Sequence, residues 1–434
     1  MLKKMSNLNN WLILILSPLS FLIVLSVLII RPLFIIRFGE ILIYRFGHTL
    51  KNVEIYSANK KLEKSTGFFS KKIDIFFFSA KASNEFLKTI CKRHFLVMPF
   101  QLIYSVFVIL NWLSILSNFI LIKNYDFNQR TARDRDKTNY NFFDKHIIFI
   151  RNYDYDQNNL LDKTKSILNF TKEEIEKGDS LLERLGIRKG EKFVCFVTRD
   201  NTYLKEYLND PNQVTSVWTL RNSDVETYKL AAEELVRLGY KVIRAGKYTE
   251  KKITFGNSNI IDYANSNYAS DFLDIYLAYK CEFAFGDSSG WSTAPMAFRK
   301  HFAFANWAPY DTVHFYSKKN TFIFKKYFSR DLQKILSLNE MEESNIIAIV
   351  GRTADLEKKN IQLIDNTPEE IKDLVIEVEK KYRGEFIIDD ENLYLQNKFR
   401  DFIKKNVFSI TRRKYTYKLQ SYCGTKFLKT IKFN

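Results

Sequence analysis

The second half of the chain alternates short apolar segments with amphipathic ones, and this alternation constrains the fold more than any other feature. Four apolar segments are predicted to be buried strands, at residues 193–198, 241–244, 282–285 and 302–306. Residues 225–238 and 271–279 carry apolar side chains at helical spacing. Strands that alternate with helices are typical of a parallel sheet covered by helices. We therefore predict an α/β fold with a doubly wound, Rossmann-like sheet in this part of the chain.

The first half has a similar but less regular pattern. Three apolar segments are predicted strands, at residues 33–36, 41–44 and 73–78. Residues 84–92 are a predicted helix, and residues 46–48 a predicted turn with Thr49 as the N-cap of the helix after it. This order of strand and helix also favours a parallel sheet.

A chain of 434 residues accommodates two or three domains at ~150 residues each. We predict four segments: a membrane anchor at 1–30, a Rossmann-like domain at 31–190 that includes a hydrophobic run at 95–122, a second Rossmann-like domain at 191–385, and a basic tail at 386–434. Between residues 398 and 432 the tail has eleven Lys or Arg and one acid, Asp401. It is either a solvated tail or one attracted to lipid headgroups, at about 1 kcal/mol per basic residue near the surface; we favour the membrane.

Residues 11–30 form a run of twenty residues without a charge, enough for a helix across ~30 Å of hydrocarbon. Lys3 and Lys4 precede it, and Arg31 follows. A cleaved signal peptide is the rival interpretation, but no small-x-small cleavage site follows the run. We favour an uncleaved anchor that spans the membrane or lies in its interface. The run at 95–122 is a second membrane helix, a surface-bound patch, or a buried strand plus helix. The positive-inside rule then predicts a membrane-associated protein at the cytoplasmic face of the inner membrane.

The formal net charge of +18 favours anionic partners: nucleic acid, a phosphorylated substrate or an anionic membrane surface. Nucleic acid is the weakest of these, because the densest positive charge lies in the tail of a chain with membrane-seeking segments. The four cysteines form no C-x-x-C pair, so neither a zinc site nor a disulfide framework is indicated.

Residues 285–290, FGDSSG, follow a predicted strand and precede a predicted helix that starts near Ser289. The carboxyl end of a parallel strand is where open α/β sheets bind ligands, and a helix N-terminus favours phosphate. Gly286, Ser288, Ser289 and Gly290 would then form a phosphate cradle. Asp287 repels phosphate, so it caps the helix or accepts a hydrogen bond from a sugar or ribose hydroxyl. A plain capped turn is the alternative.

Three more loops at strand ends or helix starts each carry an arginine: Arg199, Arg221 and Arg244. Any one of them alone is explained by a surface salt bridge. Three arginines converging with the 286–290 loop on one rim of the sheet indicate a diphosphate site, because guanidinium groups give forked hydrogen bonds to phosphate.

Several motifs in this chain are similar to those of a family of bacterial surface-polysaccharide glycosyltransferases. They are RFGH (45–48) with Asn52, Val53 and Glu54, TRDNTYL (198–204), RNSDVETY (221–228), GYKVIRAGK (239–247), DFLDIYLAYKCEFAFGDSSG (271–290), Pro295 and FRK (298–300). The similarity covers roughly residues 30 to 320. It implies a GT-B-like architecture, in which two Rossmann-like domains face each other across a cleft. The resemblance then implies that the domain at 31–190 is the acceptor side and that the domain at 191–385 binds the nucleotide sugar.

The resemblance also implies a reaction without metal or another cofactor. This agrees with the placement of the two formal D-x-D matches, at 134–136 and 154–156, in a polar connector instead of after a strand. His48 is the predicted catalytic base, since an imidazole near neutral pKa can take a proton from an acceptor hydroxyl. A turn histidine bonded to backbone is the alternative, and Asp200 and Asp224 are the runner-up carboxylates.

These observations predict a glycosyltransferase that moves a sugar from a nucleotide-sugar donor to a surface polysaccharide or a lipid-linked glycan. The alternatives are another nucleotide-sugar-using α/β enzyme, such as an epimerase, and a non-enzymatic membrane scaffold that binds anionic polymer. A G-x-G-x-x-G motif at the first strand or a Walker loop would favour a different nucleotide enzyme, and the sequence has neither.

Overall fold

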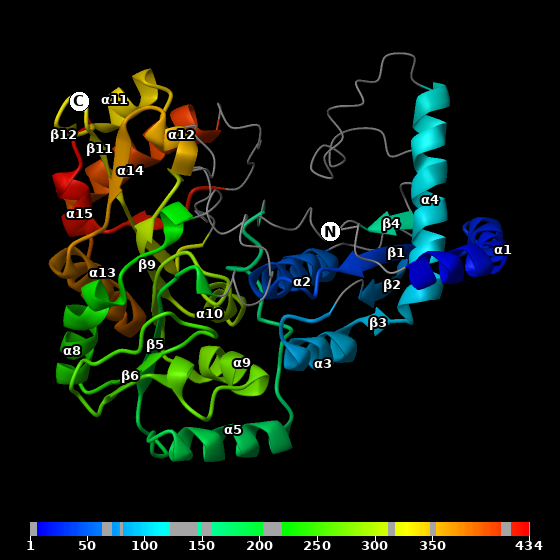
Figure 1. Cartoon of the computed structure of the whole chain (residues 1–434), viewed down its shortest axis with the longest axis horizontal. Helices are drawn as coiled ribbons and strands as arrows, with labels where there is room; N and C mark the ends of the chain where they lie inside the picture. The colour runs from blue at the N-terminus through cyan, green and yellow to red at the C-terminus, as the bar shows by residue number, and fades with distance from the viewer. Residues whose placement is uncertain are drawn as a thin grey trace. The chain divides into compact units, whose positions relative to one another are not determined.

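The chain forms two compact units in the computed structural model, which describes residues 7–62, 72–78, 81–121, 146–148, 156, 158–202, 219–310, 317–347, 353–408 and 418–433 (Figure 1). Unit 1 comprises Met1–Tyr155 and Ile167–Asn169, and unit 2 comprises Asp156–Ser166 and Phe170–Asn434. The predicted domain boundary was residue 190. The contacts instead place helix α5 (Lys172–Arg184) in unit 2, where Tyr276 donates a hydrogen bond to the carbonyl of Ile175.

Unit 1 is built on a four-stranded parallel sheet with the order β3-β2-β1-β4. Its strands are β1 (Ile35–Ile41), β2 (Lys72–Phe78), β3 (Leu96–Val97) and β4 (Ile147–Ile148). The order is that of a Rossmann-like sheet, and it reverses direction between β1 and β4. The two predicted strands at 33–36 and 41–44 are wrong: one strand, β1, covers the residues between them.

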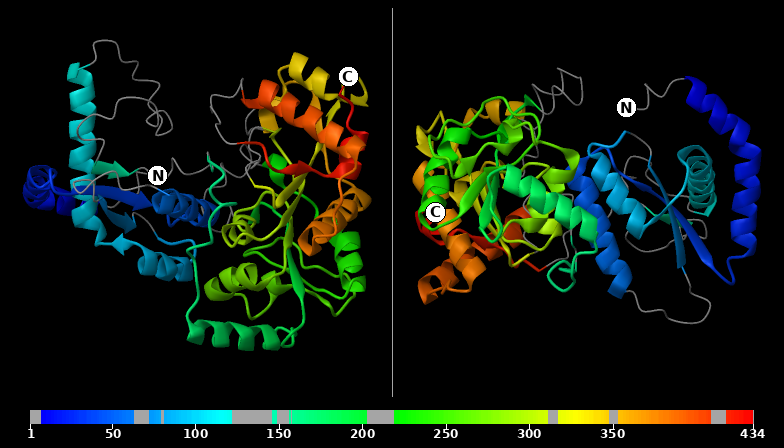
Figure 2. Two further views of the ribbon diagram at one scale, coloured as in Figure 1. Left: turned by 180° about the vertical axis from the view of Figure 1, so that it is seen from behind. Right: turned by 90° about the horizontal axis from the view of Figure 1, so that it is seen from below.

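Helices cover both faces of this sheet (Figure 2). They are α1 (Asn7–Ile29), α2 (Phe46–Leu62), α3 (Glu85–His94) and α4 (Phe100–Leu121). Neighbouring residues of β2 point to opposite faces. The ring of Phe76 lies 5.5 Å from that of Tyr56 of α2, while the ring of Phe77 lies 5.5 Å from that of Phe107 of α4. The sheet therefore lies between an α2/α3 layer and an α4 layer.

Helix α1 contains all but the last residue of the apolar run at 11–30, and it packs against α4. Its Val24 and Val27 are buried in one cluster with Val106 and Leu110 of α4. The run at 95–122 is the short strand β3 followed by α4, which is the strand-plus-helix alternative. Within the described ranges, no helix combines the length and the apolar character that a bilayer crossing requires.

Helix α2 is fixed to the sheet by a buried carboxylate. Asp74 of β2 accepts hydrogen bonds from Nε of Arg37 at 2.6 Å and from Nη2 of the same side chain at 3.0 Å. From α2, Lys60 donates to it at 2.6 Å, and Tyr56 donates as well. Burial alone would raise the pKa of Asp74, but these donors and the Arg37 charge lower it.

The predicted turn at 46–48 and the N-cap at Thr49 are wrong, because α2 already begins at Phe46. Thr49 lies inside the helix, where its hydroxyl donates to the carbonyls of Leu42 at 2.7 Å and Arg45 at 2.9 Å. It therefore serves carbonyl groups that precede the helix, whereas an N-cap serves amide groups inside it.

Unit 2 contains a seven-stranded sheet with the order β14-β10-β9-β8-β5-β6-β7, parallel throughout. Its strands are β5 (Phe193–Val197), β6 (Lys241–Arg244), β7 (Ile260–Ile261), β8 (Ala284–Gly286), β9 (Phe302–Trp307), β10 (Asn320–Phe324) and β14 (Tyr422–Cys423). The chain runs from β5 outward to β7, then crosses back and continues outward from β8. The predicted α/β fold with parallel sheets is thus confirmed.

Helices and a small antiparallel sheet surround this sheet. The helices are α8 (Lys229–Arg237), α9 (Asp271–Lys280), α10 (Thr293–Ala297), α11 (Leu338–Glu343), α12 (Thr353–Glu357), α13 (Pro368–Arg383), α14 (Asp390–Ile403) and α15 (Thr425–Thr430), with shorter turns η7 (Thr219–Arg221), η8 (Val225–Tyr228), η9 (Tyr263–Asn265) and η11 (Lys404–Phe408). The small sheet has the order β12-β11-β13, from β11 (Lys326–Ser329), β12 (Lys334–Ile335) and β13 (Ile361–Ile364).

The segment predicted as a basic tail contains regular structure that belongs to unit 2. Strand β14 pairs in parallel with β10, so that Cys423 lies opposite Phe322. Gln396 of α14 brackets this strand, because its amide oxygen accepts from the Cys423 N–H at 3.1 Å and its amide nitrogen donates to the Cys423 carbonyl. Residues 418–433 are therefore part of the fold as well as a source of charge.

Candidate functional site

The candidate site lies at the carboxyl ends of the unit 2 strands. The strand order reverses between β5 and β8, and in open parallel sheets ligands bind in the crevice outside such a reversal. The loop after β5 begins with Thr198 and Arg199, and the loop after β8 begins with Asp287. These are two of the segments in which the sequence predicted donor-binding residues.

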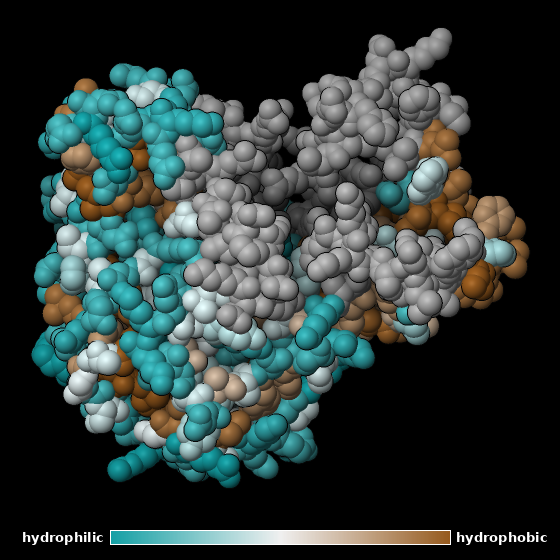
Figure 3. All heavy atoms as spheres, viewed as in Figure 1, coloured by the Kyte–Doolittle hydropathy of each residue, from teal (hydrophilic) through white to brown (hydrophobic). Residues whose placement is uncertain are grey.

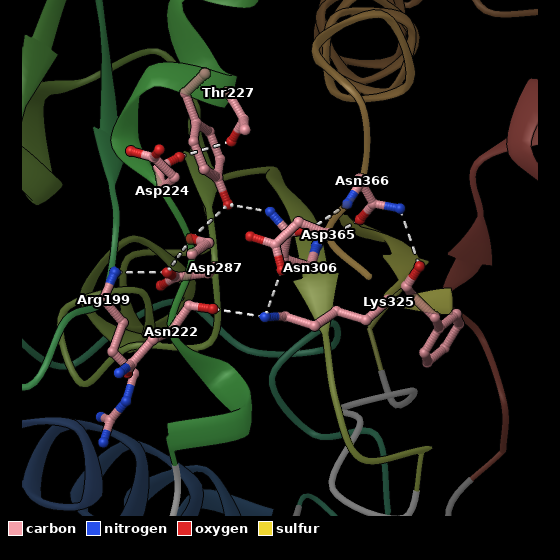
Figure 4. A network of polar contacts seen from close by, with 12 residues as sticks. Arg199, Asn222, Asp224, Thr227, Asp287, Asn306, Lys325, Asp365 and Asn366 are labelled. Carbon is pink, nitrogen blue, oxygen red and sulfur yellow. Dashed lines mark hydrogen bonds and ion pairs between the residues drawn. The ribbon is translucent and has the colours of Figure 1, made fainter. Parts of the chain in front are cut away.

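Asp287 links the two loops (Figure 4). It is fully buried, and its Oδ2 accepts hydrogen bonds from the backbone N–H of Arg199 at 2.5 Å and from the Ser223 hydroxyl at 2.7 Å. Its Oδ1 has no hydrogen-bond partner among the residues that the structure describes. Burial raises the pKa of Asp287 to about 6, against the opposing effect of these donors and of the charges of Arg199 and Lys325.

Gly286 makes the close approach of the two loops possible. Its φ is +141°, and a Cβ at this position would lie 2.0 Å from the carbonyl oxygen of Val197. Only glycine avoids this clash with backbone. The sequence analysis included Gly286 in the cradle, and the structure gives the reason for a glycine there.

Two of the three predicted arginines lie beside Asp287 and Ser288. The backbone of Arg199 is held by Asp287, and Figure 4 shows its side chain extending away from that carboxylate. Burial lowers the pKa of the Arg199 guanidinium, although the charges of Asp287 and Asp200 act in the opposite direction. Nη1 of Arg221, at the end of η7, donates to the Ser288 hydroxyl at 3.4 Å. The Arg221 guanidinium and the Ser288 hydroxyl therefore lie together at the site, to which Arg199 contributes its backbone.

Arg244 lies at the end of β6, as predicted, but its guanidinium serves the fold. It is 1 % exposed, and it donates to the Lys251 carbonyl at 2.5 Å and to the Thr198 hydroxyl at 3.4 Å. Asp262 lies 3.8 Å from it. Burial lowers the pKa of Arg244. These contacts use the guanidinium of Arg244 to hold neighbouring loops of unit 2 together. Arg244 therefore has a structural role and does not join Arg199 and Arg221.

The predicted helix start at Ser289 is wrong. Helix α10 begins at Thr293 and has five residues, so no long helix points its N-terminus at the cradle. Ser289 and Gly290 lie in a turn, in which the Ser292 hydroxyl donates to the Ser289 carbonyl at 2.7 Å and the Thr293 hydroxyl to the Gly290 carbonyl at 2.8 Å. Asp287 accordingly does not cap a helix. Residues 289–292 form a plain turn, which was the alternative to the phosphate cradle.

The two runner-up carboxylates have structural contacts. Asp200 accepts the Thr202 N–H and the Glu250 N–H, one on each oxygen and both at 2.8 Å. Asp224 is exposed and is the N-cap of η8, where it accepts the Glu226 N–H at 3.2 Å. Both side chains shape loops around the site.

Four polar residues that the sequence did not single out as site residues, Ser223, Tyr228, Asn306 and Asn366, form a chain of hydrogen bonds that starts at Asp287 (Figure 4). The Tyr228 hydroxyl lies 3.3 Å from that of Ser223 and accepts from the Asn306 amide at 3.2 Å. Asn306 and Asn366 exchange backbone-to-side-chain hydrogen bonds of 2.7 and 2.6 Å. The sequence could have pointed to three of these residues, because Ser223 and Tyr228 belong to the RNSDVETY segment and Asn306 ends a predicted strand. No sequence pattern pointed to Asn366.

Lys325 is the third cation near Asp287. It directly follows β10, is 5 % exposed, and donates to the Asn222 carbonyl at 2.5 Å and to Asp365 at 2.7 Å. The sequence analysis ended its sheet at residue 306 and therefore did not consider the end of β10. With Lys325, four neighbouring strands, β5, β8, β9 and β10, each contribute a polar residue at one edge of the sheet.

His48 lies in unit 1, apart from the other predicted residues in the chain. It is half-buried in the first turn of α2, which follows β1 after four residues. Strand β1 is where the order of the unit 1 sheet reverses, so His48 lies near the carboxyl edge at the reversal. Of the formal D-x-D residues, 134–136 and 154–155 lie outside the described residues, and Asp156 accepts the backbone N–H groups of Leu160 and Leu161, both at 2.7 Å.

No family model and no curated protein matches this chain. Among solved structures, it is similar to the crystal structure of the glycosyl transferase family 9 from Veillonella parvula DSM 2008, with a TM-score of 0.40 and 12% sequence identity, over 80% of this chain and 99% of that one. This TM-score is below the range of a shared fold, so the architecture described above rests on the strand order of this chain itself.

Proposed function

We propose that this chain is a glycosyltransferase that takes a sugar from a nucleotide-sugar donor and transfers it to a surface polysaccharide or a lipid-linked glycan. The observation that carries the proposal is the reversal of strand order between β5 and β8, where the loops that carry Arg199, Arg221 and Ser288 meet at the buried Asp287. A strand order of this kind, with polar groups at its reversal, favours a nucleotide ligand. The motif similarity described above supplies the reaction class.

In this proposal the donor diphosphate lies against Arg221 and the Ser288 hydroxyl, and Arg199 is a donor-binding residue of the loop after β5. When the bond between the sugar and the diphosphate breaks, negative charge develops on the leaving group, and guanidinium groups held in place stabilise it. Asp287 positions the Arg199 backbone through Oδ2, and its Oδ1 is the acceptor for a ribose or sugar hydroxyl. The reaction needs no metal in this scheme.

Unit 1 is the proposed acceptor side of a GT-B-like enzyme. His48 is the proposed base, which removes the proton from the attacking hydroxyl. The further part of the proposal is the location, at the cytoplasmic face of the inner membrane, which places the enzyme near a lipid-linked acceptor. Its support is the uncharged N-terminal run with lysines before it and the net charge of +18.

The test is the melting of the detergent-purified full chain with UDP, GDP, CMP, ADP and TDP, with Mg²⁺ and with chelator. Ligand at ~100 times Kd stabilises by about 2.7 kcal/mol, which raises Tm by about 5 °C or more. Arg221→Gln should weaken binding of the active nucleotide by about 10-fold or more, because a charge-assisted hydrogen bond is lost. Arg237→Gln is the matched control, since Arg237 is an exposed arginine paired with Glu234 in the same unit.

The outcomes separate the candidates. A metal-independent shift with one nucleotide, weakened in Arg221→Gln alone, supports the donor site, and loss of sugar transfer in His48→Asn with an unchanged shift supports the base. A nucleotide shift without transfer to any glycan acceptor favours the other nucleotide-sugar enzyme. A cooperative transition that no nucleotide moves overturns the proposal and leaves the polyanion-binding scaffold.

A further inference from the structure

Helix α1 is apolar on both its inner and its outer side. Ser20, Val24 and Val27 are buried, as expected for the side that packs on the fold. The opposite side is exposed, with Ile15 at 68 % and Leu22 at 59 %. From residue 15 on, where the side chains are described, the outer face of α1 is made of its exposed residues Ile15, Pro18, Leu19, Phe21, Leu22, Leu25, Ser26 and Ile29. A surface helix of a water-soluble fold carries polar residues on this side, so the outer face of α1 requires an apolar partner.

The exposed apolar surface continues beyond α1. On α4, Trp112 is 65 % exposed, and Leu116 one turn later is exposed too. Leu96 and Met98, just before α4, are exposed as well. Figure 3 shows hydrophobic side chains gathered over α1 and α4. One or two exposed apolar residues are ordinary on a protein surface, but a run over several turns of two packed helices marks a contact surface.

Positive charge borders this surface. Helix α3 ends in Lys92, Arg93 and His94, all exposed, two residues before the exposed Leu96. Arg93 and His94 are held at the surface by Asn169, whose carbonyl lies 3.5 Å from the guanidinium and whose side-chain oxygen lies 3.1 Å from Nε2 of the imidazole. Apolar side chains bordered by basic ones fit a bilayer that exposes acyl chains below anionic headgroups.

We infer that unit 1 binds an anionic lipid bilayer through the outer face of α1 together with Trp112, and that α1 lies in the plane of the interface. The inner side of α1 belongs to the core of unit 1, where Val24 and Val27 pack with Val106 and Leu110. A helix that crossed the bilayer would have to leave these contacts. The hydroxyl of Ser26, the polar group on the outer face, donates to the Leu22 carbonyl at 2.9 Å, so it enters the interface already satisfied.

A second copy of the chain is the other possible partner for an apolar face. Pairing two copies through this surface would bring the Lys92 and Arg93 groups of both chains to one interface, where like charges repel. Anionic headgroups neutralise the same groups, and each basic residue near such a surface is worth about 5-fold in binding. The charge at the border therefore favours lipid. The inference rests on the membrane location within the proposed function and is independent of sugar transfer.

The experiment is flotation of the full chain, diluted from detergent, with vesicles of phosphatidylcholine alone or mixed with phosphatidylglycerol. We expect binding to the anionic vesicles, weakened about 10-fold or more in Leu19→Gln/Leu22→Gln, because two apolar side chains are lost from the contact. Lys92→Gln/Arg93→Gln should weaken binding about 25-fold on anionic vesicles and have little effect on neutral ones. The matched control is Leu332→Gln/Ile387→Gln, which changes two exposed apolar residues of unit 2.

Depth is read from Trp112, by the difference between the fluorescence of the wild type and that of Trp112→Phe. Lipids brominated close to the headgroup should quench Trp112 more strongly than lipids brominated near the chain end. Equal flotation of the Leu19/Leu22 and control variants, deep quenching, or a lipid-free dimer that only Leu19→Gln/Leu22→Gln dissociates would each overturn the inference. The nucleotide-induced Tm shift, measured on the same preparations, reports the donor site separately, so failure of one proposal is distinguishable from failure of the other.

Discussion

At the scale of single residues, Asp287 joins the loops that meet where the strand order reverses between β5 and β8. Its side chain is fully buried, and one oxygen holds both the Arg199 N–H and the Ser223 hydroxyl. The other oxygen has no partner within the described part of the chain. A carboxylate buried in this way lowers the stability of the folded state when it is ionised. In return, Asp287 supplies a hydrogen-bond acceptor at the place where the ligand is proposed to bind.

This trade has a pH dependence. Burial raises the folded-state pKa of Asp287 to about 6, above its ordinary value of 3.8. The folded state therefore binds the proton more tightly, and stability falls as the pH rises from about 4 through 6, by on the order of 2–3 kcal/mol. Asp287→Asn should remove that part of the fall, measured as Tm between pH 4 and 7.5. Asp274, whose pKa burial raises to about 7, should retain its own contribution; superimposable wild-type and variant profiles would contradict the assignment.

At the scale of elements, charged side chains fix a helix to a sheet where apolar packing alone would not. Helix α2 lacks an apolar stripe, yet residues around its whole circumference are buried, among them Lys51, Asn52 and Glu54. The Asp74 cluster joins it to β1 and β2. Glu54 accepts the N–H groups of Ile167 and Leu168, which ties the 167–169 segment to unit 1.

Loss of the Asp74 charge should therefore loosen α2. Asp74→Asn removes the buried anion that Arg37 and Lys60 both contact, and we expect a cost of about 3–5 kcal/mol. Lys60→Gln is the control, with a cost below about 1 kcal/mol, because the Lys60 side chain is nearly half exposed. Hydrogen exchange of α2 peptides and the urea midpoint of unit 1 measure both variants. Equal protection of α2 in the two would show that the carboxylate does not hold the helix.

The sequence was most informative where apolar residues fill a whole strand. All five residues of FVCFV are buried in β5. A short, fully apolar run of this kind is typical of a central strand of a parallel sheet, which helices cover on both faces. It was least informative about side chains that meet only through the fold. Lys325 and Asp287 are 38 positions apart, and no local pattern relates them. The start of α10 was misplaced because Ser289, Gly290 and Ser292 close their own turn, while Pro295 falls in the first helical turn, where proline is tolerated.

At the scale of the whole molecule, the two units repeat one principle. Each parallel sheet begins with a central strand, adds two strands on one side and then continues on the other. In both units predicted site residues lie next to that reversal: His48 after β1, and Arg199 and Asp287 after β5 and β8. The larger sheet ends in β14, so its edge is completed by the segment predicted as a tail.

The structural role of that segment can be separated from its charge. A chain that stops at residue 417 exposes the edge of β10 and removes the strand that Gln396 brackets. We expect a loss of more than about 4 kcal/mol in the stability of unit 2, or aggregation through the open edge. Lys426→Gln/Lys429→Gln removes two exposed charges paired with Asp373 and Glu391, and should change the stability of unit 2 little, because water screens exposed ion pairs. Circular dichroism melting compares them; a truncated chain as stable as the double variant would refute the role of β14.

The position of β14 also sets the order of events during synthesis. Unit 1 has all of its segments once residue 169 has been made. The sheet of unit 2 lacks the strand that pairs with β10 until β14, which ends at Cys423, has been made. From the end of β10 at Phe324 to Cys423 there are 99 residues, which take roughly 5–20 s at the usual pace of translation. During this interval strands β5 to β10 are present on the nascent chain without their last partner. Chaperone occupancy on the ribosome should therefore concentrate on the β5–β10 region and end when the final strand emerges.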